Sequence, residues 1–332
     1  MKKLFTILAV AAAVVACQKN ETIALDNGEA IAFGNAFVEN SVRATDLSYS
    51  GTKDLELFKV YGTVTGGENT TGGTVAIFNG DDVTGSVGTA VWSCNNKQYW
   101  IAGATYAFAA VADAESVTCE NGLPKSMVYS SAVDAETGFQ KDLLYATASA
   151  TGKASGNDYV NFTFNHLLSK VKFTVTSNTE EGYYYSVKNI EVANYDGGTY
   201  TIGATTPWTV GTAANIAFGD IEEVTKASSE GEGTAKTSGK TCVNEKLLVP
   251  TATAFNVTFD VELYKDDTLL SKQENVTKSV EIKNAENTLV GLEAGKAYNF
   301  TIALSVGELI QFTVTEQPKW TNDPTGFDVP LQ

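Results

Sequence analysis

Residues 255–264 read FNVTFDVELY, and this stretch decides the fold class. Large apolar side chains alternate with mostly polar ones, so one face of the strand would be apolar and the other would be polar and exposed to solvent. A period of two is typical of a strand in an antiparallel sheet that packs one face on a core. The same alternation returns at residues 171–175, 298–304 and 310–314. We therefore expect an all-β protein built from antiparallel β-sandwiches.

Length and turn signals predict how the strands are divided. Turn-forming residues stand at 79–82, 196–198 and 265–267. The low-complexity stretch 226–240 is interpreted as a mobile loop inside the second half, because strands resume on both sides of it. A chain of 332 residues is too long for one ordinary sandwich, so we predict an N-terminal sandwich over residues 44–165 and a C-terminal one over residues 166–332.

The first residues have the pattern of a secretory signal peptide. Lys2 and Lys3 precede an apolar run from Leu4 to Ala16, which is too short for a transmembrane helix. Cys17 follows the small residues that end the run, an order that resembles the lipobox of bacterial lipoproteins. We predict that residues 1–16 are removed by a cut between Ala16 and Cys17, and that the Cys17 thiol is acylated. The alternative is an ordinary signal peptide that happens to end near a cysteine.

Charge and cysteine content restrict the partners. The formal charge of −16 becomes −18 once Lys2 and Lys3 are removed, which argues against binding to nucleic acid or to anionic lipid surfaces. An acidic ectodomain held to a membrane by its acyl chains fits this charge. With Cys17 acylated, three cysteines remain and allow one disulfide at most. Cys94 and Cys119 could pair, or both could be buried thiols together with Cys242.

Catalytic and metal-binding patterns are scarce. The only histidine, His166, has apolar neighbours, so a packed and hydrogen-bonded side chain is favoured over a general base. A single histidine also argues against a His-rich metal site. The adjacent acids at 81–82, 222–223 and 266–267 are interpreted as solvated turns rather than as glycosidase carboxylates, since neighbours on a strand point to opposite faces. No enzyme activity, metal or cofactor is predicted.

Several motifs resemble those of a known family. Residues 142–146 (DLLYA) and 162–173 (FTFNHLLSKVKF) resemble the central signature of the fimbrillins, the pilin subunits of lipoprotein-derived type V pili of Bacteroidales-type bacteria. Trp92, Tyr99–Trp100 and residues 106–108 resemble the pattern of the family's first domain. Residues 298–302 through Trp320 resemble its C-terminal pattern. The lipobox and the early Arg43-Ala44-Thr45 complete the resemblance.

The resemblance implies a fold and a route of export, maturation and assembly. The fold would be two tandem transthyretin-like β-sandwiches, and the chain would reach the outer membrane and cell surface as a lipoprotein. A trypsin-like maturation protease would cut between Arg43 and Ala44 and release the lipidated propeptide, residues 17–43. The remaining chain would polymerise with other pilus subunits by strand exchange, forming a fimbrium that serves cell adhesion. The motifs do not separate shaft, anchor and tip roles.

The physical pattern near the N-terminus fits a removable strand. Ile31, Phe33 and Phe37 would share one face of a strand, and small residues from Ala32 to Val38 would share the other. Burying the three large side chains would contribute about 5–9 kcal/mol. Losing this strand should leave an apolar groove between two unpaired strand edges.

A candidate replacement strand lies at the other end of the chain. Phe327, Val329 and Leu331 alternate with Asp328 and Pro330, which makes a short amphipathic strand. Proline cannot donate to a strand ladder, so Pro330 restricts this segment to an edge or a strand end. We expect the segment to be the donor strand for a neighbouring subunit. The alternative is that it closes its own domain.

A different class of function is also considered. The chain could be a pilus-tip or stand-alone surface lipoprotein that captures a host glycan or protein. Exposed aromatic side chains such as Trp92, Trp100 or Trp208 could then form a sugar platform, unless they belong to the sandwich cores. An enzyme is the least favoured of the three.

Overall fold

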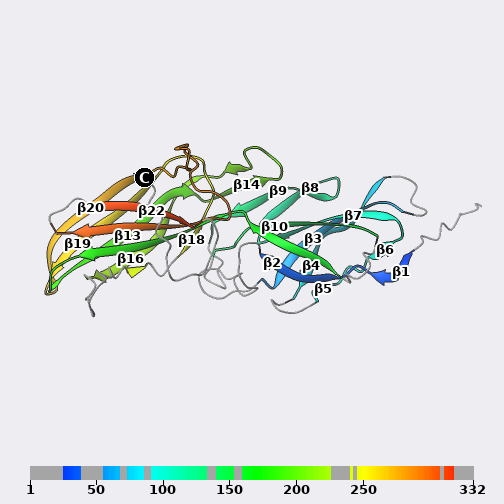
Figure 1. Ribbon diagram of the computed structural model, residues 1–332, viewed down its shortest axis with the longest axis horizontal. Helices are drawn as coiled ribbons and strands as arrows, with labels where there is room; N and C mark the ends of the chain where they lie inside the picture. The colour runs from blue at the N-terminus through cyan, green and yellow to red at the C-terminus, as the bar shows by residue number, and fades with distance from the viewer. Residues whose placement is uncertain are drawn as a thin grey trace, which may run out of the picture.

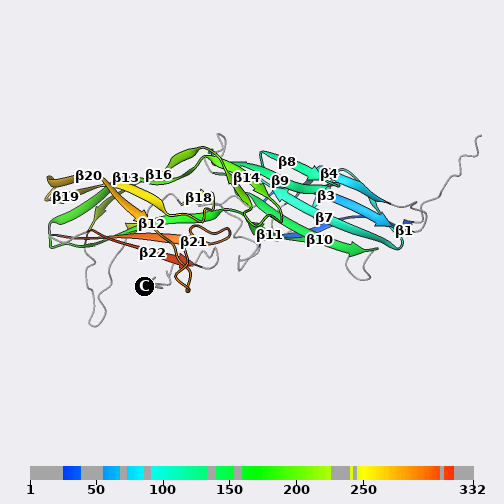
Figure 2. The same cartoon turned by 90° about the horizontal axis from the view of Figure 1, so that it is seen from above.

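A computed structural model describes residues 25–38, 55–67, 73–85, 91–132, 140–152, 159–225, 240–241, 245–306 and 310–317. Cys17, Arg43, Ala44, Cys242 and the tail with Phe327, Val329 and Leu331 lie outside these residues. All the regular elements in the described ranges are β-strands, so the all-β prediction is confirmed. None of the described residues forms a helix long and apolar enough to cross a membrane. The strands build an elongated molecule, from β1 at one end to β19 and β20 at the other (Figures 1 and 2).

The first half is one sheet that curls around its core. Seven strands are hydrogen-bonded in the order β2-β11-β10-β7-β3-β4-β5, and β1 and β6 form a separate pair. The two ends of the large sheet meet where Phe33 of β2 bridges Trp92, which directly precedes β5. The strands are β1 (Leu25–Ala30), β2 (Phe33–Val38), β3 (Leu57–Gly66), β4 (Thr74–Thr84), β5 (Ser93–Cys94), β6 (Tyr99–Ile101), β7 (Ala104–Ala112), β10 (Leu144–Thr151) and β11 (Val160–His166).

The second half packs two sheets face to face. One has the order β17-β12-β21-β22, with β18 also paired to β12, and the other has the order β16-β13-β19-β20. Buried aromatic and branched side chains, among them Phe173, Phe218 and Phe300, fill the space between them. The strands are β12 (Ser169–Asn178), β13 (Tyr183–Tyr195), β16 (Ala213–Val224), β17 (Lys240–Thr241), β18 (Lys246–Leu248), β19 (Phe255–Lys265), β20 (Thr268–Val280), β21 (Ala297–Ser305) and β22 (Gln311–Gln317).

A fifth sheet takes strands from both halves. Its order is β15-β14-β9-β8, and its strands are β8 (Ser116–Glu120), β9 (Leu123–Ser130), β14 (Gly197–Thr201) and β15 (Trp208–Val210). Figure 2 shows β8, β9 and β14 along one side of the molecule near its middle.

The four alternating stretches of the sequence are strands, as predicted. They are β12, β19, β21 and β22. The pairing is not antiparallel throughout, however, because β2 runs parallel to β11 and β12 runs parallel to β21. Period-two alternation predicts a strand and its buried face, but it carries no information about the direction of the partner strand.

The predicted turns have mixed outcomes. Asp266 and Asp267 both have positive φ, 45° and 62°, and form the two-residue turn between β19 and β20, as predicted. Residues 79–82 do not form a turn but lie inside β4, where Gly80 with φ 82° is a bulge opposite β3. The turn predicted at 222–223 is also wrong, because these residues belong to β16, but both side chains are exposed to solvent, as predicted.

Irregular positions in β13 and β20 flank one buried carboxylate of β19. Asn189 of β13 and Asn275 of β20 have positive φ, 53° and 54°, at shifts in the strand register. Between them Asp260 of β19, only 9% exposed, accepts the Asn275 backbone N–H at 2.8 Å and the Asn189 side-chain amide at 2.8 Å. These two hydrogen bonds lower the pKa of the Asp260 carboxyl.

Asp260→Ala is expected to lower the free energy of unfolding by about 1.5–3 kcal/mol, because hydrogen bonds to a buried charged acceptor are lost. The folded pKa lies below the unfolded value of about 3.9, so the stabilisation is present above that pH and is lost as the pH falls through the folded pKa. Denaturant unfolding of both proteins from pH 7 to pH 3 measures the difference. The control is the exposed Asp82→Ala, which among the described residues loses a surface pair with Lys59. A difference for Asp260→Ala that does not shrink below about pH 4 would contradict the assignment.

Candidate functional site

The N-terminal segment 25–38 is hydrogen-bonded on both sides. On one side, Ile31 N–H donates to the Gln98 carbonyl at 2.7 Å and Trp92 N–H donates to the Phe33 carbonyl at 2.9 Å. On the other side, Val160 N–H donates to the Ala32 carbonyl at 2.8 Å, and β2 continues in parallel along β11. The segment is therefore the piece that closes the curled sheet. Figure 1 shows β2 in blue beside β5 along the lower edge of the first half.

Side chains of this segment belong to the core of the first half. Phe33 has no exposed surface and Ile31 is 5% exposed. The Phe33 ring centroid lies 5.4 Å from that of Phe78, 6.0 Å from that of Phe162 and 6.5 Å from that of Phe108. The burial predicted for Ile31 and Phe33 is confirmed.

The predicted alternation does not hold along the whole segment. Phe33 is opposite Val160 and Ala36 is opposite Phe162, so β2 has one more residue than β11 over this stretch. A bulge of one residue moves the following side chains to the other face. Ala36, expected on the small-residue face, is therefore buried in the same core as Phe33. Phe37 pairs with Thr163 through the backbone, and its side chain lies outside the described part of the structure.

The segment approaches β11 closely at a glycine. A Cβ atom on Gly34 would lie 2.2 Å from Asn161 Oδ1 and 2.8 Å from Tyr159 Cβ, so no larger residue fits without rearrangement. Next to this contact is a pocket of about 220 Å³, lined by Trp100, Ala148, Ala150, Tyr159 and Val160 among others. Sequence reasoning missed this pocket, because its walls come from three separate stretches of the chain.

The single histidine is buried, as its neighbours predict. His166 Nδ1 lies 2.7 Å from Asp142 Oδ2, and the two side chains are 3% and 9% exposed. Asp142 was not foreseen as its partner, because the two residues meet only through the pairing of β10 with β11. The His166 ring is buried, and Asp142 also lines the neighbouring pocket.

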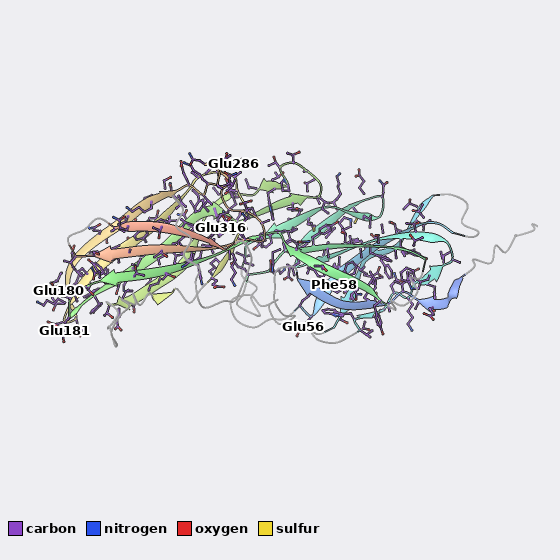
Figure 3. All side chains as sticks on the ribbon, viewed as in Figure 1. Glu56, Phe58, Glu180, Glu181, Glu286 and Glu316 are labelled. Atoms are coloured by element: carbon purple, nitrogen blue, oxygen red, sulfur yellow. The ribbon has the colours of Figure 1, made fainter. Side chains whose placement is uncertain are left out.

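A second pocket, of about 360 Å³, lies beside this pair. It is lined by residues 55–59, 111–114, Val117 and 141–144, excluding Leu143. Figure 3 labels Glu56 and Phe58 in this region of the first half, while the labelled carboxylates Glu180, Glu181, Glu286 and Glu316 belong to the second. At the pocket, Lys59 pairs with Asp82 at 2.8 Å and Lys141 with Glu115 at 2.9 Å. Within the described ranges, no three His, Cys, Asp or Glu side chains are grouped so that they could hold a metal ion.

The aromatic platform considered for a glycan is wrong for the three tryptophans that the structure describes. Trp92, Trp100 and Trp208 are 3%, 4% and 8% exposed and belong to cores. The pairing considered for Cys94 with Cys119 is also not formed, because both are free, half-buried thiols. Burial raises the pKa of each of these thiols.

Comparison with known proteins identifies the family. The family model described as fimbrillin-like matches residues 43–318, most of the chain. The chain belongs to the fimbrillin-like family. No curated protein sequence matches the chain significantly.

Solved structures of two Bacteroides proteins have a similar fold. A fimbrial protein from Bacteroides vulgatus superposes with a TM-score of 0.59 at 13% identity, over 87% of this chain and 99% of that one. A candidate cell adhesion protein from Bacteroides uniformis superposes with a TM-score of 0.50 at 18% identity, over 88% of this chain and 99% of that one. At these identities the likeness concerns the fold.

Proposed function

We propose that this fimbrillin-like chain is a structural subunit of a pilus, which matures by losing its N-terminal strand and polymerises by accepting a strand from a neighbour. Membership of the fimbrillin-like family supports the pilus role. The observation that carries the mechanism is the closing segment itself, which is hydrogen-bonded on both edges and supplies Phe33 to the core.

The position of Arg43 makes this segment removable. Arg43 is the only arginine of the chain and follows the end of β2 at Val38. A trypsin-like protease that cuts between Arg43 and Ala44 would sever residues 17–43 from residues 44–332. Before the cut, an acyl group on Cys17 would hold the whole chain to the outer membrane. After the cut, residues 44–332 would be held to the lipidated segment only by the noncovalent contacts of its strand.

The energetics of the empty site favour a replacement strand. Ile31 and Phe33 together contribute about 3–6 kcal/mol by burial, comparable to the net stability of a small domain. Their loss would expose the rings around Phe33 and free both flanking edges, β11 and residues 92–98. An extended segment from a second subunit can occupy such a gap by β-strand addition. Because this contact is head-to-tail and need not close, it propagates as a filament.

We assign the donor role to the C-terminal tail with Phe327, Val329 and Leu331. Deleting residues 326–332 is expected to leave cleavage by an arginine-specific protease normal and to abolish polymer growth, because no strand remains to fill a neighbour's gap. Denaturing gels after protease treatment measure the cut, and size-exclusion chromatography with electron microscopy measures the polymers. A matched control replaces Asp328, which alternates with these apolar residues in the sequence, with Asn, so that the apolar side chains are kept. Long polymers from the truncated protein would show that another segment is the donor.

A further inference from the structure

The junction between the two halves is a continuous sheet rather than a flexible linker. β9 of the first half pairs with β14 of the second from Ser130↔Gly197 to Ser126↔Thr201. Beyond the ladder, Ser131 N–H donates to the Asp196 carbonyl at 2.9 Å and Ile202 N–H donates to the Lys125 carbonyl at 3.0 Å. Bending the molecule here requires these bonds to break together.

A third hydrophobic core lies beneath this sheet. Met127 and Tyr129 of β9 belong to it, and so does Trp208 of β15. The Tyr129 and Trp208 rings are 6.2 Å apart in an edge-to-face arrangement, and Trp208 Nε1–H donates to the Leu167 carbonyl at 3.2 Å. The remaining buried members also come from both halves, and they are Tyr61, Ala109, Val111, Leu143, Leu167, Leu168, Leu247 and Val249.

A side-chain amide adds a second link across the junction. Gln140, 7% exposed and just ahead of β10, accepts Leu247 N–H at 2.8 Å through Oε1 and donates to the Leu247 carbonyl at 3.1 Å through Nε2. Asn194 makes the same pair of bonds with Val249, at 3.0 and 3.1 Å. The two amides therefore take the place of a neighbouring strand along residues 247–249, and one of them comes from the first half.

The shared ladder also requires a close backbone approach. Gly197 has φ 150°, and a Cβ atom there would lie 2.2 Å from the Tyr129 carbonyl oxygen and 3.0 Å from Ser130 Cα. Both obstacles are backbone atoms, which cannot rotate away as a side chain can. A larger residue at this position must therefore push β14 away from β9.

From these contacts we infer that the junction is a mechanical clamp that makes the two halves a single rigid, cooperatively folding unit. The clamp is the β9–β14 ladder, the core beneath it and the Gln140 amide link. A pull along the long axis of the molecule (Figure 1) passes through the clamp, which resists it with many bonds at once. The inference concerns the single chain and holds whether or not the chain polymerises.

Thermal unfolding and X-ray scattering test the clamp. The wild-type protein is expected to melt in one calorimetric transition whose calorimetric and van't Hoff enthalpies agree. Gly197→Val is expected to melt in two transitions and to give a broader, longer distribution of interatomic distances in scattering. Gln140→Ala is expected to keep the wild-type shape and to lower the Tm by roughly 2–8 °C. Gln98→Ala is the matched control, since among the described residues its amide bonds to Asn96, within the first half.

Two results would overturn the inference. One is a wild-type protein whose halves melt independently. The other is a Gly197→Val protein that melts once and scatters like the wild type. If Gly197→Val does not fold, Gln140→Ala decides, and a Tm equal to that of Gln98→Ala refutes the clamp.

Discussion

Arg43→Ala is expected to abolish both maturation and polymer formation while leaving the fold intact. Arg43 is the only arginine, so this one change removes every site for an arginine-specific protease. Without the cut, Phe33 stays covalently tied to the rest of the chain and returns to its core after each local opening. A tethered strand competes with an incoming one at a high effective concentration, in the millimolar range for a short flexible link. Exchange is therefore suppressed by orders of magnitude rather than slowed modestly.

Protease treatment of purified protein followed by electron microscopy measures both effects. Wild-type protein should shorten by the propeptide and form filaments, and Arg43→Ala should do neither. Arg43→Lys distinguishes the effect of losing the cut from the effect of losing the arginine side chain. A lysine-specific protease should restore cleavage at position 43, and it should also cut at other lysines. Filaments formed by uncut Arg43→Ala would refute the requirement for strand release. A lack of filaments after a confirmed cut of the wild type would show that the cut alone does not start polymerisation.

The local pattern predicted the strands better than it predicted how they meet. β19 and β21 could be foreseen because alternation is a property of neighbouring residues. The closure of the first sheet could not be predicted from local alternation, because the bridge between Phe33 and Trp92 joins residues that are far apart in the sequence. The shared sheet was missed for the same reason: four strands, β10 to β13, lie between β9 and β14 along the chain. Pairing between distant segments depends on the packing of the whole chain.

Bulges explain the errors at single positions. The sequence predicts Gly80 in a turn because glycine beside acidic residues is common in turns, yet glycine with positive φ also occurs at a bulge inside a strand. Strict alternation predicts the wrong face for Ala36 because it leaves no place for an extra residue in β2. Burial of His166 followed from its apolar neighbours, but its bond to Asp142 needed the register of β10 and β11.

Phe33→Ala is expected to loosen the closing segment without any cut. Replacing a fully buried phenylalanine with alanine costs about 3–5 kcal/mol, and here the loss falls on the segment that we propose to be exchangeable. Local opening of the segment should become more frequent by roughly two to three orders of magnitude, since each 1.4 kcal/mol is about tenfold. The Trp92 and Val160 amides donate directly to the segment, and so report its opening.

Hydrogen exchange of these amides in an Arg43→Ala background measures the effect without interference from cleavage. The matched control is Phe218→Ala, which empties an equally buried phenylalanine site in the core of the second half. Both variants should lose similar global stability, but only Phe33→Ala should speed exchange at Trp92 and Val160. Equal acceleration in the two variants would mean that the segment opens only when the whole chain unfolds. In that case the closing strand is an integral part of the fold, and a cut after Arg43 alone could not release it.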